Sequence, residues 1–119
     1  MPALIGILED DEALRAYVEA VVESAEGMTL AFSAGSLADA HKASVGKPVD
    51  LCLVDLKLPD GSGLDFVSHI KANSTAKCLI FTVLGDRASV LLALKSGADG
   101  YLLKDTPPDL LRSNIDRTL

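Results

Sequence analysis

The sequence predicts an α/β domain in which five parallel strands alternate with five helices. Short apolar runs rich in Ile, Leu and Val recur between segments whose apolar residues have helical spacing. The connections between these segments are short, and such an alternation folds as a parallel sheet covered on both faces, with right-handed crossovers. A chain of 119 residues has room for one domain, so we expect a single domain over residues 1–119.

Strands are expected at residues 4–8, 28–33, 51–55, 78–82 and 99–103. Helices are expected at residues 12–26, 36–45, 63–71, 86–97 and 108–119. The first helix has apolar residues along one face until Gly27 stops it. Ser36 is a preferred N-cap residue and opens the second helix. The third strand is a continuous apolar run, which indicates burial on both faces of the sheet.

Turn and cap residues define the elements of the second half. Residues 59–63 (PDGSG) are rich in Pro and Gly, and we expect turn and helix-cap chemistry there rather than a phosphate-binding loop. Asp86 opens the fourth helix, and Pro108 lies in the first turn of the last one. Residues of these two helices expected to face the core are Val90, Leu91, Leu94, Leu110, Leu111 and Ile115.

Composition excludes several classes of function. The net charge of −6 argues against a nucleic-acid-binding surface on this domain. The N-terminus lacks a basic region followed by an apolar stretch, and no apolar run approaches membrane-spanning length, so we expect a cytoplasmic protein. Cys52 and Cys78 lie in expected strands and are interpreted as small core residues. His41 and His69 are isolated on expected helices and should be solvated.

Acidic residues end two of the apolar runs, Glu9 and Asp10 after the first and Asp55 at the end of the third. Asp11 and Glu12 follow directly and are assigned to the helix N-terminus, where acidic side chains favour the helix dipole. In the flavodoxin-like (βα)5 doubly wound sheet, with strand order 2-1-3-4-5, ligands bind outside the carboxyl ends of strands 1 and 3. This order would place all three site carboxylates together.

The chemistry of this edge indicates a cation and a phosphoryl group. Two carboxylates about 4 Å apart repel by about 4 kcal/mol at an effective dielectric constant of 20, so they need a cation or raised pKa values. Oxygen ligands without Cys or His favour Mg²⁺. Thr82 and Lys104 end two further strands at the same edge, and a hydroxyl with an ammonium group suits phosphoryl oxygens. A carboxylate nucleophile among them indicates an aspartyl phosphate.

Four motifs carry a resemblance to a known family. They are residues 7–12 (ILEDDE), 50–63 (DLCLVDLKLPDGSG), 80–82 (IFT) and 97–104 (GADGYLLK). With these motifs in this order, the chain resembles the receiver domain of two-component response regulators over its whole length. The resemblance implies that Asp55 accepts a phosphoryl group from a sensor histidine kinase.

The resemblance also implies a role for each neighbour of Asp55. Mg²⁺ would be bound by Asp10, Asp55 and the backbone carbonyl of Lys57, with Glu9 acting mostly through water. Thr82 would hydrogen-bond the phosphoryl group and Lys104 would pair with its charge. Tyr101 would be the aromatic residue that swings inward as Thr82 moves.

Two positions depart from the common pattern of the family. Asp105 follows the lysine where many receivers have proline, and the sequence GYLLKD resembles the subgroup with LuxR-type helix-turn-helix output domains. That subgroup implies transcription regulation through an output domain absent from this chain, and a homodimer on phosphorylation. Val83 replaces a smaller residue after the threonine, so we expect a narrower approach to Asp55 and slower exchange with small donors and water.

One other function stays open for this chain, and two further functions on the same fold fit it less well. A stand-alone receiver acting by protein–protein interaction differs only in its output. A flavodoxin-like electron carrier would need a Ser/Thr/Gly-rich loop after the first strand, where this chain is acidic. A phosphohydrolase would need a second carboxylate two residues past the nucleophile, where Lys57 stands. We therefore expect a phosphoacceptor with at most slow self-phosphorylation and autodephosphorylation, not an enzyme.

Overall fold

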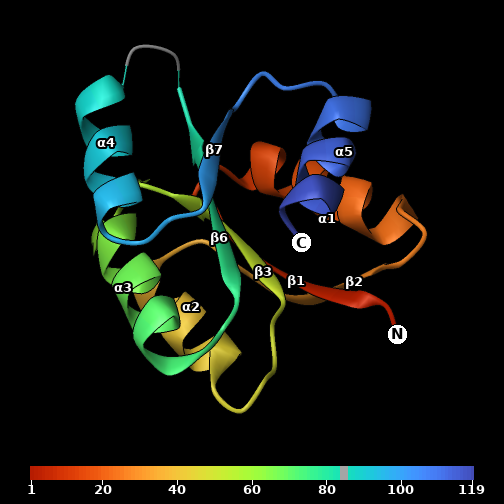
Figure 1. Ribbon diagram of the computed structural model, residues 1–119, viewed down its shortest axis with the longest axis horizontal. Helices are drawn as coiled ribbons and strands as arrows, with labels where there is room; N and C mark the ends of the chain where they lie inside the picture. Colours follow the sequence, from red (N-terminus) through yellow and green to blue (C-terminus); the bar gives the residue numbers. More distant parts are fainter. Residues whose placement is uncertain (84–85) are drawn as a thin grey trace.

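Five parallel strands form the central sheet in the order β2-β1-β3-β6-β7 (Figure 1). The computed structural model describes residues 1–83 and 86–119. The strands of this sheet are β1 (Ala3–Leu8), β2 (Met28–Ala34), β3 (Leu51–Asp55), β6 (Lys77–Thr82) and β7 (Gly100–Leu103). The labels β4 (Lys57–Leu58) and β5 (Gly61–Ser62) belong to a separate antiparallel hairpin. Counting the main sheet alone, the order is the expected 2-1-3-4-5.

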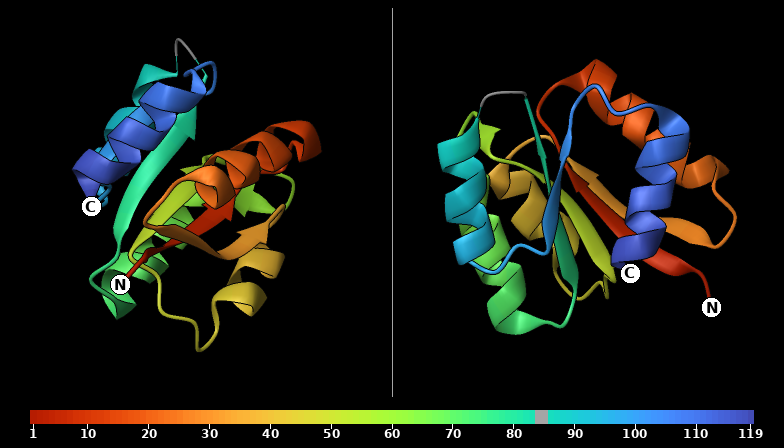
Figure 2. Two further views of the ribbon diagram at one scale, coloured as in Figure 1. Left: turned by 90° about the vertical axis from the view of Figure 1, so that its right-hand side faces the viewer. Right: turned by 45° about the horizontal axis from the view of Figure 1, so that its top comes forward.

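Helices cover both faces of this sheet, as two turned views show (Figure 2). The helices are α1 (Glu12–Ser24), α2 (Leu37–Ser44), α3 (Gly63–Asn73), α4 (Arg87–Lys95) and α5 (Pro108–Thr118). Helices α1 and α5 pack with one buried cluster, and α2, α3 and α4 pack with the other. The predicted doubly wound α/β architecture is therefore confirmed.

Side-chain alternation in β3 explains why its sequence is continuously apolar. Leu51 and Leu53 face α1 and α5, whereas Cys52 and Val54 face α2, α3 and α4. All five residues of the strand are buried, including Asp55 at its end. Because helices cover both faces, every side chain on a central strand of the sheet is removed from water.

Polar side chains cap the helices near the C-terminal ends of the strands. An Asp11 carboxylate oxygen accepts a 2.9 Å hydrogen bond from the Leu14 N–H at the start of α1. Ser36 accepts from the Asp39 N–H at 3.1 Å, and Ser62 accepts from the Leu64 N–H at 3.2 Å. The expected cap chemistry in the turn at 59–63 is thus present at Ser62.

The hairpin after β3 also holds α2, a contact that was not expected. The two carboxylate oxygens of Asp60 accept hydrogen bonds from the N–H groups of Leu37, at 2.8 Å, and Ala38, at 3.0 Å. These backbone hydrogen bonds lower the pKa of Asp60. The loop that follows Asp55 is therefore fastened to the N-terminus of α2.

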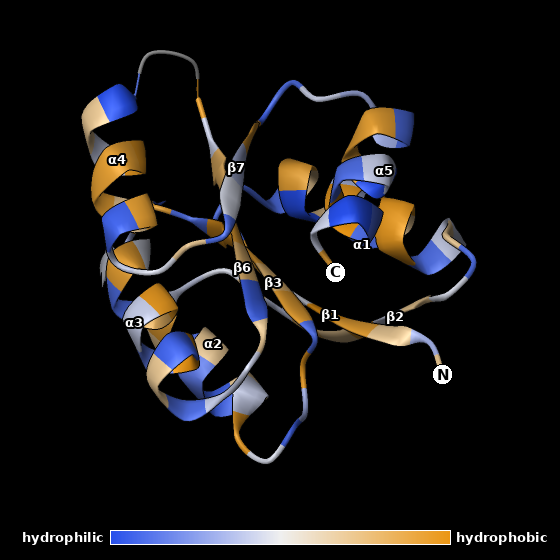
Figure 3. Ribbon diagram, viewed as in Figure 1, coloured by the Kyte–Doolittle hydropathy of each residue, from blue (hydrophilic) through white to orange (hydrophobic). Residues whose placement is uncertain are grey.

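Three predicted core positions in α4 and α5 are wrong. Leu91 and Leu110 are 58% and 53% exposed, and Leu94 is also exposed. In α4 the buried residues are Val90 and Ala93. Residues 90–94 are all apolar, so the periodicity could not select a face, and the small Ala93 side chain lets the helix pack closely. Figure 3 shows hydrophobic residues, coloured orange, along α4.

The remaining compositional expectations have mixed outcomes. Cys52 and Cys78 are buried free thiols, and burial raises the pKa of Cys78 to about 11, so their assignment to the core is confirmed. His69 is exposed, but His41 is half-buried against Phe66, which corrects its assignment as solvated. Across residues 1–83 and 86–119, each helix is too short or too polar to span a membrane.

Candidate functional site

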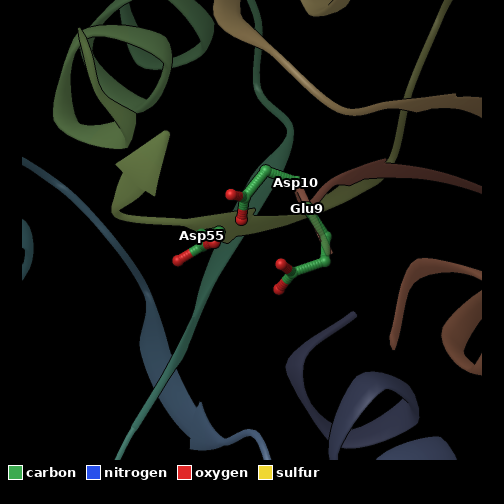
Figure 4. A group of neighbouring side chains, drawn as sticks. All are labelled: Glu9, Asp10 and Asp55. Atoms are coloured by element: carbon green, nitrogen blue, oxygen red, sulfur yellow. The ribbon is translucent and has the colours of Figure 1, made fainter. Parts of the chain in front are cut away.

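Three carboxylates meet at the C-terminal edge of the sheet, where the adjacent strands β1 and β3 end. Leu8 of β1 lies beside Val54 of β3, so the residues that follow them come together. Glu9, Asp10 and Asp55 each place a carboxylate oxygen within 4.8 Å of the others. Figure 4 shows these side chains projecting from the two adjacent segments.

Glu9 is held at this edge by backbone contacts on both sides. Its side chain is buried, with 1% exposed, and accepts a 3.0 Å hydrogen bond from the Asp11 N–H. Its backbone carbonyl accepts a 2.8 Å hydrogen bond from the guanidinium group of Arg15 in α1. The role of Arg15 was not expected from the sequence, because a single basic residue in a helix carries no signal of a contact with the preceding loop.

The Lys104 side chain, which follows β7, forms ion pairs with two of the three carboxylates. Its ammonium nitrogen lies 3.0 Å from a carboxylate oxygen of Glu9 and 3.0 Å from one of Asp55. The sheet positions this lysine, because the backbone N–H of Lys104 donates a 2.7 Å hydrogen bond to the backbone carbonyl of Thr82. Lys104 thus balances part of the negative charge of the site.

Thr82 and Tyr101 lie on neighbouring strands but in different environments. Thr82 is buried at the end of β6, one residue beyond Phe81, which pairs with Asp55. Tyr101 in β7 is 52% exposed, so its side chain lies at the surface. Both border a groove of about 560 Å³ that also contacts Leu91 and Leu94 of α4.

The pKa values of the site show how closely its charges interact. Burial raises the pKa of Glu9 to about 7 and also raises the pKa of Asp55. Burial acts against ionisation of Asp10 too, but hydrogen bonding to Asp55 and Glu9 outweighs it and lowers the pKa of Asp10. For Lys104, burial favours the neutral amine, yet its two carboxylate partners raise its pKa.

These features fit a hard divalent cation. The donor set consists of carboxylate oxygens, and a single ammonium group cannot neutralise three of them. The Lys57 N–H donates a 3.3 Å hydrogen bond to Asp55, which brings the start of β4 to the same place. Among the described residues, these carboxylates are the one group of three or more ligating side chains that could hold a metal ion.

In the metal-free protein, the free energy of unfolding is expected to fall as pH rises from about 4.5 to about 7. The pKa of Glu9 rises from 4.5 to about 7 on folding, so in this window the folded chain binds more protons than the unfolded chain. This group should therefore remove on the order of 3 kcal/mol of stability across the window. Chemical denaturation at several pH values measures this loss of stability. If the free energy of unfolding of Glu9→Gln depended on pH in the same way as that of the original protein, the assignment would be contradicted.

A doubly wound sheet with clustered carboxylates and a lysine at its C-terminal edge is typical of the receiver class of signalling domains. The chain belongs to this class: the family model for the response regulator receiver domain matches residues 5–116. The protein is thus a receiver domain of two-component signal transduction, a family whose members interact with sensor histidine kinases.

Relatives among known proteins support this assignment. The chain is 33% identical over 114 residues to the nitrate/nitrite response regulator protein NarL of Escherichia coli K12, covering 94% of this chain and 53% of NarL. It is 32% identical to NarP of the same organism, covering 96% of this chain and 54% of NarP. The chain therefore spans about half the length of these curated relatives.

Solved structures agree on the fold, and one of those described here belongs to the LuxR family. A LuxR-family two-component response regulator from Aurantimonas sp. SI85-9A1 is 27% identical, with a TM-score of 0.86, and the match covers 98% of this chain and 84% of that chain. A CheY-like receiver domain protein from Methanospirillum hungatei JF-1 is 25% identical, with a TM-score of 0.85, covering 99% and 94%. The resemblance to the LuxR-type subgroup is thus supported.

Proposed function

We propose that residues 1–119 act as a phosphorylation switch with Asp55 as the phosphoacceptor. The observation that carries this proposal is the position of the Asp55 carboxylate. It is buried at the end of a central strand, 3.0 Å from the Lys104 ammonium group and within 4.8 Å of two further carboxylates. A carboxylate in this setting is oriented and charge-balanced for attack on a phosphoryl group.

Asp10, Asp55 and the Lys57 carbonyl would hold Mg²⁺, with Glu9 acting mostly through water. The oxygen-only donor set and the raised pKa values of Glu9 and Asp55 favour such a cation. When bound, the ion supplies positive charge that reduces repulsion between the carboxylates and an incoming phosphoryl group.

Asp55 would take the phosphoryl group from a phosphohistidine of a sensor kinase. An Asp55 carboxylate oxygen forms a bond to phosphorus, the phosphorus–nitrogen bond breaks, and the electron pair stays on the leaving imidazole. Lys104 would then pair with the phosphoryl oxygens, and the Thr82 hydroxyl would donate to one of them. The added charge of about −1.5 to −2 makes both contacts stronger.

The output would follow from a population shift between two conformations. Movement of Thr82 toward the phosphoryl group would free space for Tyr101, which is now exposed beside α4. The likeness to LuxR-type regulators supports transcription control, with homodimer formation on phosphorylation. A stand-alone receiver acting by protein–protein interaction is the alternative.

Acetyl phosphate is expected to label the protein with one phosphoryl group per chain, in a reaction that requires Mg²⁺. The label should be an acyl phosphate, which hydroxylamine cleaves, because the acceptor is a carboxylate. Intact-mass measurement before and after hydroxylamine treatment tests this. Labelling that resists hydroxylamine, or proceeds equally with EDTA, would contradict the proposal.

Replacement of Val83 by Ala is expected to speed labelling by small donors and loss of the phosphoryl group to water, by several-fold in each case. Val83 is 52% exposed and lies two residues beyond Phe81, which pairs with Asp55, so we expect its branched side chain to limit the approach to Asp55. Labelling and decay rates of the two proteins test this directly. Equal rates would show that this side chain does not limit access.

A further inference from the structure

Two histidines from neighbouring helices lie ring to ring, away from the carboxylate site. His41 is in α2 and His69 is in α3. Their ring centres are 4.8 Å apart, and the ring planes are inclined by 80°. The sequence separates these residues by almost thirty positions, so the packing of α2 against α3 creates the pair.

This separation matches that of two imidazoles bound to one metal ion. A nitrogen ligand lies about 2.0–2.1 Å from a metal such as Zn²⁺, which puts the ring centre about 3.2 Å from the ion. Two such rings at ligand angles between 90° and 109° have centres about 4.5 to 5.2 Å apart. The observed spacing falls inside this interval, so the two helices would keep their separation and only the rings would need to rotate.

Contacts around the pair hold both rings in place. The His41 ring packs edge to face on the buried ring of Phe66, with centres 5.4 Å apart. The Nδ1 atom of His69 lies 3.4 Å from the side-chain amide of Asn73, one helical turn further along α3. The same amide group donates a 2.8 Å hydrogen bond to the His69 backbone carbonyl, so its NH2 faces Nδ1, which accepts. Binding of an ion at Nε2 of His69 would therefore move the ring proton to Nδ1 and break the contact with Asn73.

The chemistry of the pair differs from that of the carboxylate site. Imidazole nitrogen suits late first-row divalent ions, whereas Mg²⁺ prefers oxygen. In the part of the chain that the structure describes, the pair has no third ligating side chain, so water would complete the coordination. We propose that His41 and His69 form a second cation site, which takes an ion such as Ni²⁺, Cu²⁺ or Zn²⁺ and cross-links α2 to α3.

Titration of the full chain with Ni²⁺, in excess Mg²⁺ at pH 7.5, tests this proposal. Excess Mg²⁺ keeps the carboxylate site from competing, and Cys52 and Cys78 are buried. We expect one Ni²⁺ per chain by calorimetry and a rise of several degrees in the midpoint of thermal unfolding, because the ion binds the folded form. Histidine NMR signals from both rings should broaden together.

Single and double variants distinguish one shared ion from two separate ligands. His41→Gln and His69→Gln should each weaken Ni²⁺ binding at least tenfold, and the double variant should bind Ni²⁺ about as weakly as either single variant. Asp55→Asn should bind Ni²⁺ like the original protein. Unchanged affinity in His69→Gln, whose exposed side chain can be replaced without loss of folding, would overturn the proposal. So would independent, additive losses from the two histidines.

Discussion

Replacement of Asp55 by Asn is expected to abolish phosphoryl labelling by acetyl phosphate, a loss of at least a hundredfold. The amide has nearly the same shape as the carboxylate, so the fold should persist, but its oxygen is a poor nucleophile and cannot form a stable acyl phosphate. It also removes one of the carboxylates that surround the proposed Mg²⁺ position. Intact-mass measurement after incubation with acetyl phosphate and Mg²⁺ provides the readout.

Asp11→Asn is the matched control for this experiment. Asp11 belongs to the same acidic run, but its side chain caps α1 through the Leu14 N–H, a role that an Asn oxygen can also perform. This variant should therefore keep both stability and labelling. Labelling that survives in Asp55→Asn, or disappears in Asp11→Asn, would show that the acceptor is assigned to the wrong residue.

Gly63→Ala is expected to lower the free energy of unfolding by about 3 kcal/mol, the upper part of the range for overpacking. A Cβ atom on Gly63 would lie 2.0 Å from the backbone oxygen of Asp55 and 2.9 Å from its carbonyl carbon. These are backbone atoms, so the clash can be relieved only by moving the end of β3 or the start of α3. The shift should also weaken Mg²⁺ binding, because it displaces Asp55.

Gly46→Ala separates this steric effect from ordinary backbone strain. Gly46 has a positive φ of 69°, but no atom lies within 4 Å of the added Cβ position. Its replacement should cost about 1 kcal/mol, through conformation alone, and leave Mg²⁺ affinity unchanged. Urea denaturation and Mg²⁺ titration of both variants make the comparison. If Gly63→Ala and Gly46→Ala lower the free energy of unfolding by the same amount, close packing at Gly63 does not position Asp55.

The main sheet could be predicted because its signals are local and repeated. Continuous apolar runs marked the strands, and cap residues such as Ser36 marked the helices. The hairpin of β4 and β5 was missed, because two-residue strands are too short to show a period of two. The orientation of α4 was wrong for another reason: apolar residues surround the helix, and only its neighbours in the fold select Ala93 for the core.

The candidate site was predictable as a set of residue types, but its contacts were not. Once the strand order was assumed, we expected the acidic residues that end two strands to lie at one edge of the sheet, together with Thr82 and Lys104. The contacts of Arg15 with the Glu9 carbonyl and of Asp60 with the start of α2 join elements that the sequence leaves unconnected. Such contacts depend on distances that a linear pattern does not contain.

The sequence by itself determined the class of fold, the family and the residues that can carry its chemistry, because strand periodicity and the motifs around Asp55 are local properties of the chain. The tertiary structure decided how those residues interact. It placed Lys104 3.0 Å from both Glu9 and Asp55, left Tyr101 at the surface, and brought His41 against His69. The physical reason is that charge interaction and metal ligation depend on separations of a few ångströms, which only the packing of distant segments fixes.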